Sequence, residues 1–222
     1  MKKIILAGLI GTGALFGFGG NFYQNKNVNY QNSKLTKAEI QALKYMYEEE
    51  KLAKDVYYTL GKMYPELVVF NRILRAERIH EASVSNVMKH YGISLPDRGN
   101  IVGKFINPHL QKLYNELIAL GKKSPVDALK AGIMVEVTDV EDLDKYLKTA
   151  TSPDVKALFK FLRAGSYNHY NAFNWSLKRL TGKTACELMS KKWCKNYPFQ
   201  RRIGRYYRNW YWFPMFFARG TR

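Results

Sequence analysis

The chain has 222 residues, of which 46% are hydrophobic, so it is long enough to bury one domain-sized core. No internal repeat or low-complexity tract is present, which excludes a fibrous or solenoid protein. The formal net charge is +18, and half of it comes from residues 183–222, where ten Lys or Arg and the single Glu187 leave a net nine positive charges.

The first predicted element is a secretory signal peptide or an N-terminal anchor over residues 1–20. Two lysines follow Met1, and an uncharged run of Leu, Ile, Phe, Gly and Ala then extends to Gly20. Because this run is at the lower limit for a membrane span and rich in glycine, a cleaved signal is preferred to an uncleaved anchor. Both alternatives predict that the remainder is exported, as a periplasmic or membrane-associated protein on the extracytoplasmic side.

A polar linker rich in Asn and Gln is predicted for residues 21–34, and helices follow it. Thr36 and Glu39 have the spacing of a capping box, which predicts a helix from there to about residue 62. The next helices are expected at about 71–91, 107–121, 124–147 and 152–182. In the last three, Pro follows an Asn or Ser cap, as is common in the first turn of a helix.

The predicted fold class is all-α, because no segment alternates polar and apolar residues between turn signals. Four of the helices are long, which matches an antiparallel four-helix bundle over residues 35–182. The connection from about residue 92 to 125 is long and contains the short helix. We therefore expect two helical hairpins that are joined by a crossover.

Each long helix interrupts its apolar stripe near mid-length with an acidic residue or a histidine. Taken singly, these positions have plainer explanations: a carboxylate that reaches solvent, a hydrogen-bonded core histidine, or an intrahelical pair. The neighbouring Glu48 and Glu49 are expected to point away from the stripe. The residues that interrupt the stripes are Glu50, Glu77, His80, Glu136 and His169.

Antiparallel packing would bring these side chains together in the core. Burying three uncompensated carboxylates there would cost several kcal/mol each, and a bound cation removes that cost. The joint pattern therefore predicts a metal site, for which carboxylate oxygens and imidazole nitrogens favour iron or manganese, with zinc as the alternative.

Two motifs carry a resemblance to a known family. Residues Glu50 to Tyr57 match the E-x-x-A-x-x-x-Y of the first ferritin-like helix, and Glu77-Arg-Ile-His80 matches its E-x-x-H. Over about residues 35–182 the chain resembles an uncharacterised bacterial family within the ferritin-like superfamily, of the ferritin and rubrerythrin type. The resemblance implies that Tyr57 lies behind the ligands. It divides the ligands into Glu50, Glu77 and His80 in one half, and Glu136 and His169 in the other.

One position departs from the di-iron pattern. A second E-x-x-H that ends at His169 would need Glu at position 166, where this chain has Ser166. Five of the six ligands are then present, and Asp139 or a water held by Ser166 is expected to replace the sixth; a single-metal site is the alternative. If iron is bound, the resemblance implies Fe(II) oxidation by O₂ or peroxide, or peroxide reduction. The functional hypothesis is an exported non-haem iron oxidoreductase, with its catalytic residues unidentified.

Residues 183–222 are predicted to form a basic, aromatic-rich tail. Cys186 and Cys194 are expected to form a disulfide, because a cysteine pair in an exported protein seldom binds metal at this spacing. Residues 201–222 combine six arginines with eight aromatic residues. This segment is either a flexible, solvated tail or a segment that docks to a partner. Docking to a membrane surface or an anionic polymer is preferred to nucleic acid. The alternative function is therefore an envelope-associated binding protein whose bundle is only a scaffold.

Overall fold

The computed structural model describes residues 34–97 and 101–200, and all the regular structure in these residues is helical. This confirms the all-α prediction for the described part of the chain. None of the helices described has an apolar stretch of the length that a bilayer crossing requires. The elements in order are α1 (Lys37–Met63), α2 (Val69–His90), α3 (Pro108–Gly121), α4 (Pro125–Thr149), α5 (Pro153–Thr181), α6 (Ala185–Leu188) and the 3-10 helix η1 (Lys191–Trp193).

The predicted caps set the helix starts, with one exception. The Thr36 side chain accepts the Glu39 N–H at 3.1 Å, and the Glu39 carboxylate accepts the Thr36 N–H at 2.8 Å, so the capping box of α1 forms. Asn107 and Ser124 likewise accept N–H groups in the first turns of α3 and α4. Ser152 differs, because its side chain makes no capping bond. Its backbone N–H instead donates to Glu39 Oε1 at 2.7 Å, which ties the start of α1 to the α4–α5 connection.

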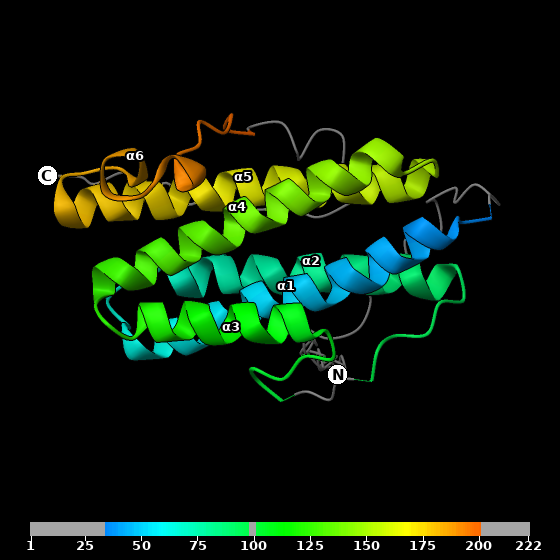
Figure 1. Ribbon diagram of the computed structural model, residues 1–222, viewed down its shortest axis with the longest axis horizontal. Helices are drawn as coiled ribbons and strands as arrows, with labels where there is room; N and C mark the ends of the chain where they lie inside the picture. Colours follow the sequence, from blue (N-terminus) through cyan, green and yellow to red (C-terminus); the bar gives the residue numbers. More distant parts are fainter. Residues whose placement is uncertain (1–33, 98–100, 201–222) are drawn as a thin grey trace, which may run out of the picture. The chain divides into compact units, whose positions relative to one another are not determined.

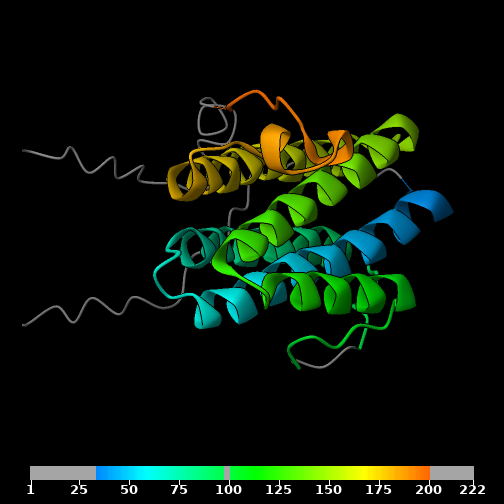
Figure 2. The same cartoon turned by 60° about the vertical axis from the view of Figure 1, so that its left-hand side comes forward.

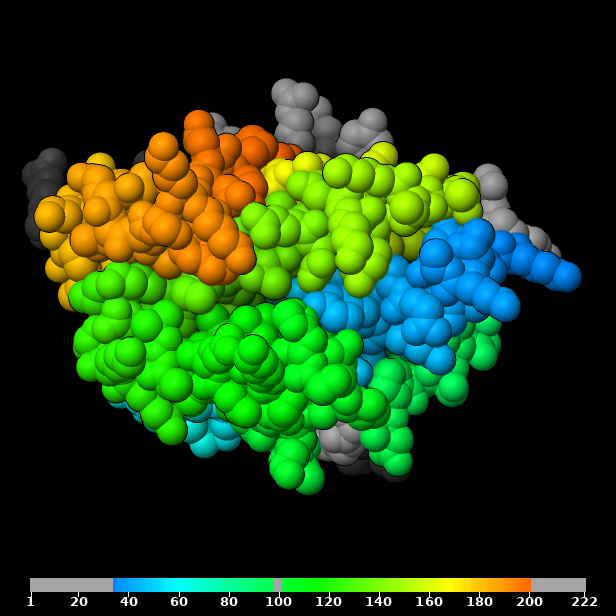
Figure 3. Space-filling view, viewed as in Figure 1, coloured from blue at the N-terminus to red at the C-terminus, as the bar shows by residue number. Residues whose placement is uncertain are grey.

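The four long helices pack as two pairs. Helices α1 and α2 lie side by side and run in opposite directions, as do α4 and α5 (Figures 1 and 2). In addition α1 contacts α4, and α2 contacts α5, so the inward faces of the four helices share one interior. The short α3 packs against α1 and α4, and it covers part of the face that Figure 3 shows.

The interior has an apolar core that is interrupted by polar side chains. Fully buried aromatic rings include Tyr57, Phe70 and Phe173, whose centroids lie 5.1–6.0 Å apart. Burying a large apolar side chain of this kind stabilises the fold by about 1.5–3 kcal/mol. Along each long helix, buried apolar residues both precede and follow the buried Glu and His positions. The polar layer is therefore enclosed by apolar packing.

The crossover between α2 and α3 is fixed to α1 by three buried charged residues, Glu48, Lys51 and Asp55, which we call the crossover anchor. Lys51 and Asp55 form an ion pair, and the remaining bonds run to backbone groups of the crossover. Glu48 accepts the N–H groups of Ile106 (2.7 Å) and Asn107 (3.2 Å), Lys51 donates to the carbonyls of Ile101 (2.9 Å) and Lys104 (3.2 Å), and Asp55 accepts the Gly103 N–H (3.0 Å).

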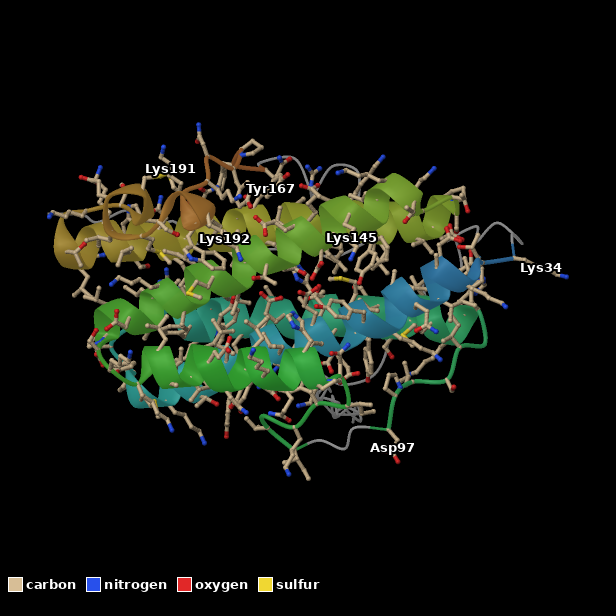
Figure 4. All side chains as sticks on the ribbon, in the orientation of Figure 1. Lys34, Asp97, Lys145, Tyr167, Lys191 and Lys192 are labelled. Carbon is tan, nitrogen blue, oxygen red and sulfur yellow. A yellow bond between two sulfur atoms is a disulfide. The ribbon has the colours of Figure 1, made fainter. Side chains whose placement is uncertain are left out.

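Residues 184–200 form a strap over α5, and the structure joins Cys186 to Cys194 within it. The Tyr170 hydroxyl donates to the Trp193 carbonyl at 3.1 Å. The ring of Tyr167 stacks on that of Tyr197 in the strap, with the ring centroids 4.5 Å apart. Figure 4 shows Tyr167 beside the strap, whose Lys191 and Lys192 are also labelled. The predicted signal or anchor, almost all of the predicted linker and the tail over 201–222 lie outside the described residues, so they stay predictions.

Candidate metal centre

The structure brings the five predicted ligands together in the interior. Each comes from the middle of a long helix: one from α1, two from α2, one from α4 and one from α5. All five are buried, with exposed fractions of 1% for Glu77, 2% for Glu50 and Glu136, 4% for His80 and 9% for His169. The helical phase of the apolar stripes therefore placed these positions correctly.

Glu77 lies at the centre of the cluster. Its Oε2 is 2.9 Å from His80 Nδ1, and its Oε1 is 2.7 Å from His169 Nδ1. One ligand atom from each of these three residues lies within 4.8 Å of the others. Glu50 adds an oxygen 3.3 Å from His80 Nδ1, and Glu136 adds one 3.5 Å from His169 Nδ1. The cluster thus has two halves, and both share the Glu77 carboxylate.

These carboxylate and imidazole groups lie at ion-pair distances, but their geometry is not that of hydrogen bonds. His80 Nδ1, His169 Nδ1, Glu77 Oε1 and Glu50 Oε1 are all inaccessible to solvent, and none has a hydrogen-bond partner. Buried polar atoms are nearly always paired, because an unpaired one costs about 1–3 kcal/mol. Donor atoms that converge without bonding one another are instead arranged around points that a further group can occupy.

The protonation of the cluster indicates that it attracts positive charge. Burial lowers the pKa of His169, but Glu77 and Glu136 outweigh burial and raise it to about 10. Burial raises the pKa of Glu77, but His169 and His80 outweigh burial and bring it below its usual value. Burial, aided by Asp139 and Glu77, holds the pKa of Glu50 well above its usual value despite His80. Protons on the imidazoles thus offset part of the carboxylate charge.

Tyr57 contacts the half of the cluster that contains Glu136 and His169. Its hydroxyl donates to Glu136 Oε1. Burial and the charge of Glu136 raise the pKa of Tyr57 well above its usual value, so the hydroxyl keeps its proton and remains a donor. The sequence predicted that Tyr57 would lie behind the ligands, and the structure gives it one defined partner there.

Ser166 and Asp139 occupy the position where a sixth ligand was expected. The Ser166 hydroxyl donates to Asp139 Oδ2, while Asp139 Oδ1 has no hydrogen-bond partner. Burial raises the pKa of Asp139 to about 8. Ser166 thus orients the carboxylate of Asp139, which is one of the two expected replacements.

Glu48 and Glu49 were expected to point away from the apolar stripe of the first helix, and the structure shows that they are nevertheless not exposed. Both are buried, with exposed fractions of 5% and 3%. Glu48 is covered by the crossover that it anchors, and a covering loop leaves no periodic signal in the sequence. Glu49 lies near Asp139 and Asp142 of α4, where burial and these charges raise its pKa well above its usual value.

Comparisons with known proteins place this chain in a wider group. A family model described as "Uncharacterized protein domain (DUF2202)" matches residues 39–195. The chain is 35% identical over 158 residues to the uncharacterised protein MJ0754 of Methanocaldococcus jannaschii, which covers 71% of this chain and 85% of that protein. The crystal structure of the hypothetical protein MJ0754 matches with a TM-score of 0.67 and 36% identity, covering 69% of this chain and 87% of that chain.

This relative changes one expectation. It comes from an archaeon, so the resemblance is not confined to bacteria as the sequence had suggested. The expectation of an uncharacterised family is confirmed. Because the family and the relative are both described as uncharacterised, the function of this chain is argued from its own site.

Proposed function

The chain belongs to the DUF2202 family, and we propose that it is a metal-binding protein whose buried centre holds two divalent first-row ions, iron or manganese in preference to zinc. One observation carries the proposal. The two oxygens of Glu77 approach two different imidazole nitrogens, at 2.9 and 2.7 Å, without hydrogen bonding to either. Glu77 would therefore help to hold two ions, one together with His80 and the other together with His169.

The donor set fits such ions. Carboxylate oxygens combined with imidazole nitrogens suit iron, manganese and zinc, whereas the absence of thiolate donors in the described centre disfavours softer ions. Glu50 and His80 would hold one ion, and Glu136 and His169 the other, with Glu77 shared between them. Asp139 Oδ1, which has no hydrogen-bond partner, is the expected sixth protein ligand.

We assign the fold to the ferritin-like type. Three features support this: two pairs of long helices, a crossover that connects them, and an E-x-x-H motif on α2 whose Glu77 and His80 both face the interior. The chain departs from that type at Ser166, where it uses Asp139 on the neighbouring helix instead.

The chemistry follows from the surroundings of the centre. Bound iron would supply electrons for the reduction of O₂ or peroxide, which makes a non-haem iron oxidoreductase or Fe(II) oxidase the proposed activity. Tyr57 holds Glu136 in place through its hydroxyl, and Ser166 does the same for Asp139. The fully buried ring of Phe70, whose centroid is 6.0 Å from that of Tyr57, belongs to the apolar packing next to Tyr57.

The proposal is tested on the purified full-length chain. After anaerobic incubation with Fe(II) or Mn(II) and removal of excess ions, elemental analysis is expected to give about two equivalents. Exposure of the Fe(II) form to O₂ is then expected to change its absorbance as Fe(III) forms. Less than half an equivalent of any metal, unchanged by Glu77→Gln, would overturn the proposal.

Glu48→Gln provides the matched control for this experiment. Glu48 is a glutamate of the same helix as Glu50 and is nearly as buried, but its carboxylate is satisfied by backbone N–H groups of the crossover. We expect Glu50→Gln to reduce metal uptake and Glu48→Gln to leave it unchanged. Equal losses in both variants would indicate an effect of buried charge on folding and not a metal site.

We also propose that the protein works outside the cytoplasm. The Cys186–Cys194 disulfide supports this, because disulfides persist mainly in oxidising compartments. The predicted signal over residues 1–20 agrees with it. Fractionation of cells that produce the full chain, with alkylation of free thiols before lysis, tests the proposal: a cytoplasmic protein with both cysteines alkylated would contradict it.

A further inference from the structure

We propose that Gly165 is a positioning residue of the metal centre: it leaves a notch in α5 that receives the His80 imidazole and holds its Nδ1 toward Glu50 and Glu77. The inference rests on the proposed function, because it assigns the device that fixes one of the two half-sites. Gly165 itself donates no ligand atom and touches no ion.

The notch is defined by the space above Gly165. A Cβ atom at this position would lie 2.4 Å from both Cε1 and Nε2 of His80. Non-bonded heavy atoms attract one another best at about 3.5–4.0 Å, so no residue with a side chain fits while the imidazole stays where it is. The His80 ring therefore rests directly on the backbone of α5.

The walls of the notch are two rings from the same helix. Phe161 and His169 lie four residues before and after Gly165, so all three share one face of α5. The His80 ring is 5.3 Å from the Phe161 ring, edge to face, and 5.3 Å from the His169 ring, stacked at 28°. The imidazole is thus enclosed on three sides by α5, and it has little room to move if the notch is filled.

Conformational freedom does not explain a glycine here. Gly165 is in the middle of a regular helix and does not have a positive φ, unlike Gly92, Gly103 and Gly182. Ala is a better residue for a helix interior than Gly. Room for the His80 ring is therefore the structural reason for glycine at this position.

Gly165→Ala is expected to displace the His80 ring and to impair its half of the centre selectively. Titration of the full-length apo protein with Mn(II) should show one site weakened by roughly 10- to 100-fold while the His169 half keeps its affinity. Gly121→Ala is the matched control, because a Cβ there would lie 2.6 Å from Leu60, away from the centre. Unchanged Mn(II) binding in Gly165→Ala, or equal losses in both variants, would overturn the role of Gly165.

A double-mutant cycle on the apo protein tests the contact without any metal. Gly165→Ala should lower Tm by roughly 3–10 °C in the wild-type background, because the core is overpacked. In the His80→Ala background the same substitution should lower Tm by much less or raise it, since the clash is gone. Equal decreases in both backgrounds would overturn the inference alone, whereas a wild-type chain that takes up no Mn(II) would overturn the proposed function.

Discussion

Two groups of buried charged residues, the crossover anchor and the metal centre, both include residues from the same two turns of α1. The two groups differ in how their charged atoms are paired. In the crossover anchor, Lys51 and Asp55 pair with each other, and Glu48, Lys51 and Asp55 all form hydrogen bonds with backbone groups. In the metal centre, Glu50 Oε1 and the Nδ1 atom of His80 are as deeply buried and have no hydrogen-bond partner.

The difference separates structural charge from ligand atoms. Folding compensates the crossover anchor by itself, because every charged group in it gains a partner when the loop closes. In the metal centre, carboxylates and imidazoles lie at ion-pair distances from one another without the geometry of hydrogen bonds. Its compensation has to come from a bound cation, or from protons in its absence. Substitutions in the two groups should therefore affect different quantities.

The largest expected effect is that of Lys51→Ala on stability. Removing this ammonium leaves the buried Asp55 carboxylate without its charged partner, which should lower the free energy of unfolding by about 3–5 kcal/mol. Urea unfolding monitored by circular dichroism measures the change. The protein that remains folded should still take up metal at wild-type stoichiometry; loss of metal without loss of stability would contradict the division between the two groups.

Glu77→Gln should have the next largest effect, and it should act on metal affinity. The amide nearly preserves the shape but removes the charge that both halves share, so we expect the affinity for Mn(II) to fall by at least about 100-fold, or about 2.7 kcal/mol. Isothermal titration of the apo protein measures it. If one ion still bound at wild-type affinity, Glu77 would not be shared between two ions.

Glu39 is a buried carboxylate that is paired by hydrogen bonds, like those of the crossover anchor. Its contribution to the free energy of unfolding should depend on pH. Although burial raises its pKa, hydrogen bonds from the N–H groups of Ser152, Thr36 and Thr151 outweigh burial and lower it to about 2. Its contribution to stability is therefore complete above about pH 4.5 and is lost as pH falls through about 2. Glu39→Gln should cost about 1–3 kcal/mol at pH 6.

The test compares urea unfolding of the wild type and Glu39→Gln from pH 6 to pH 2. Subtracting the two curves removes the titration of the other carboxylates. The difference should shrink as pH falls below about 4.5. A difference that stays constant over this range would contradict the assignment.

The smallest expected effect is that of Ser166→Ala. Without this hydroxyl, Asp139 loses its hydrogen-bond donor and is oriented less well, which should weaken one of the two ions by about tenfold. Competition with a chelator of known affinity measures the change. An effect as large as that of Glu77→Gln would mean that Ser166 is itself a ligand and not a support for Asp139.

Much of the helical framework could be predicted from local sequence. The capping box at Thr36 and the caps at Asn107 and Ser124 are short-range signals, and α1, α3 and α4 begin where these predict. Ser152 shows the limit of such signals. Its side chain does not cap α5, which still begins at Pro153, and its backbone N–H donates to Glu39, more than 100 residues away in the chain.

The burial and convergence of the candidate ligands were predictable because each one interrupts an apolar stripe. The surroundings of the centre were harder to predict from the sequence. Glu48 is buried by a loop, Asp139 is held by Ser166 across two helices, and the notch at Gly165 exists only when α2 packs on α5. These features depend on contacts between distant segments, which periodicity within one helix does not encode.

The central claim is that Glu77 lies between two metal ions in the buried interior, and anomalous diffraction from crystals of the Mn(II)-loaded full-length protein tests it most directly. Data collected on both sides of the manganese absorption edge should show two peaks that flank the Glu77 carboxylate, one next to His80 and one next to His169. A single anomalous peak at Glu77, or none, in crystals whose protein is otherwise folded as described, would contradict the account.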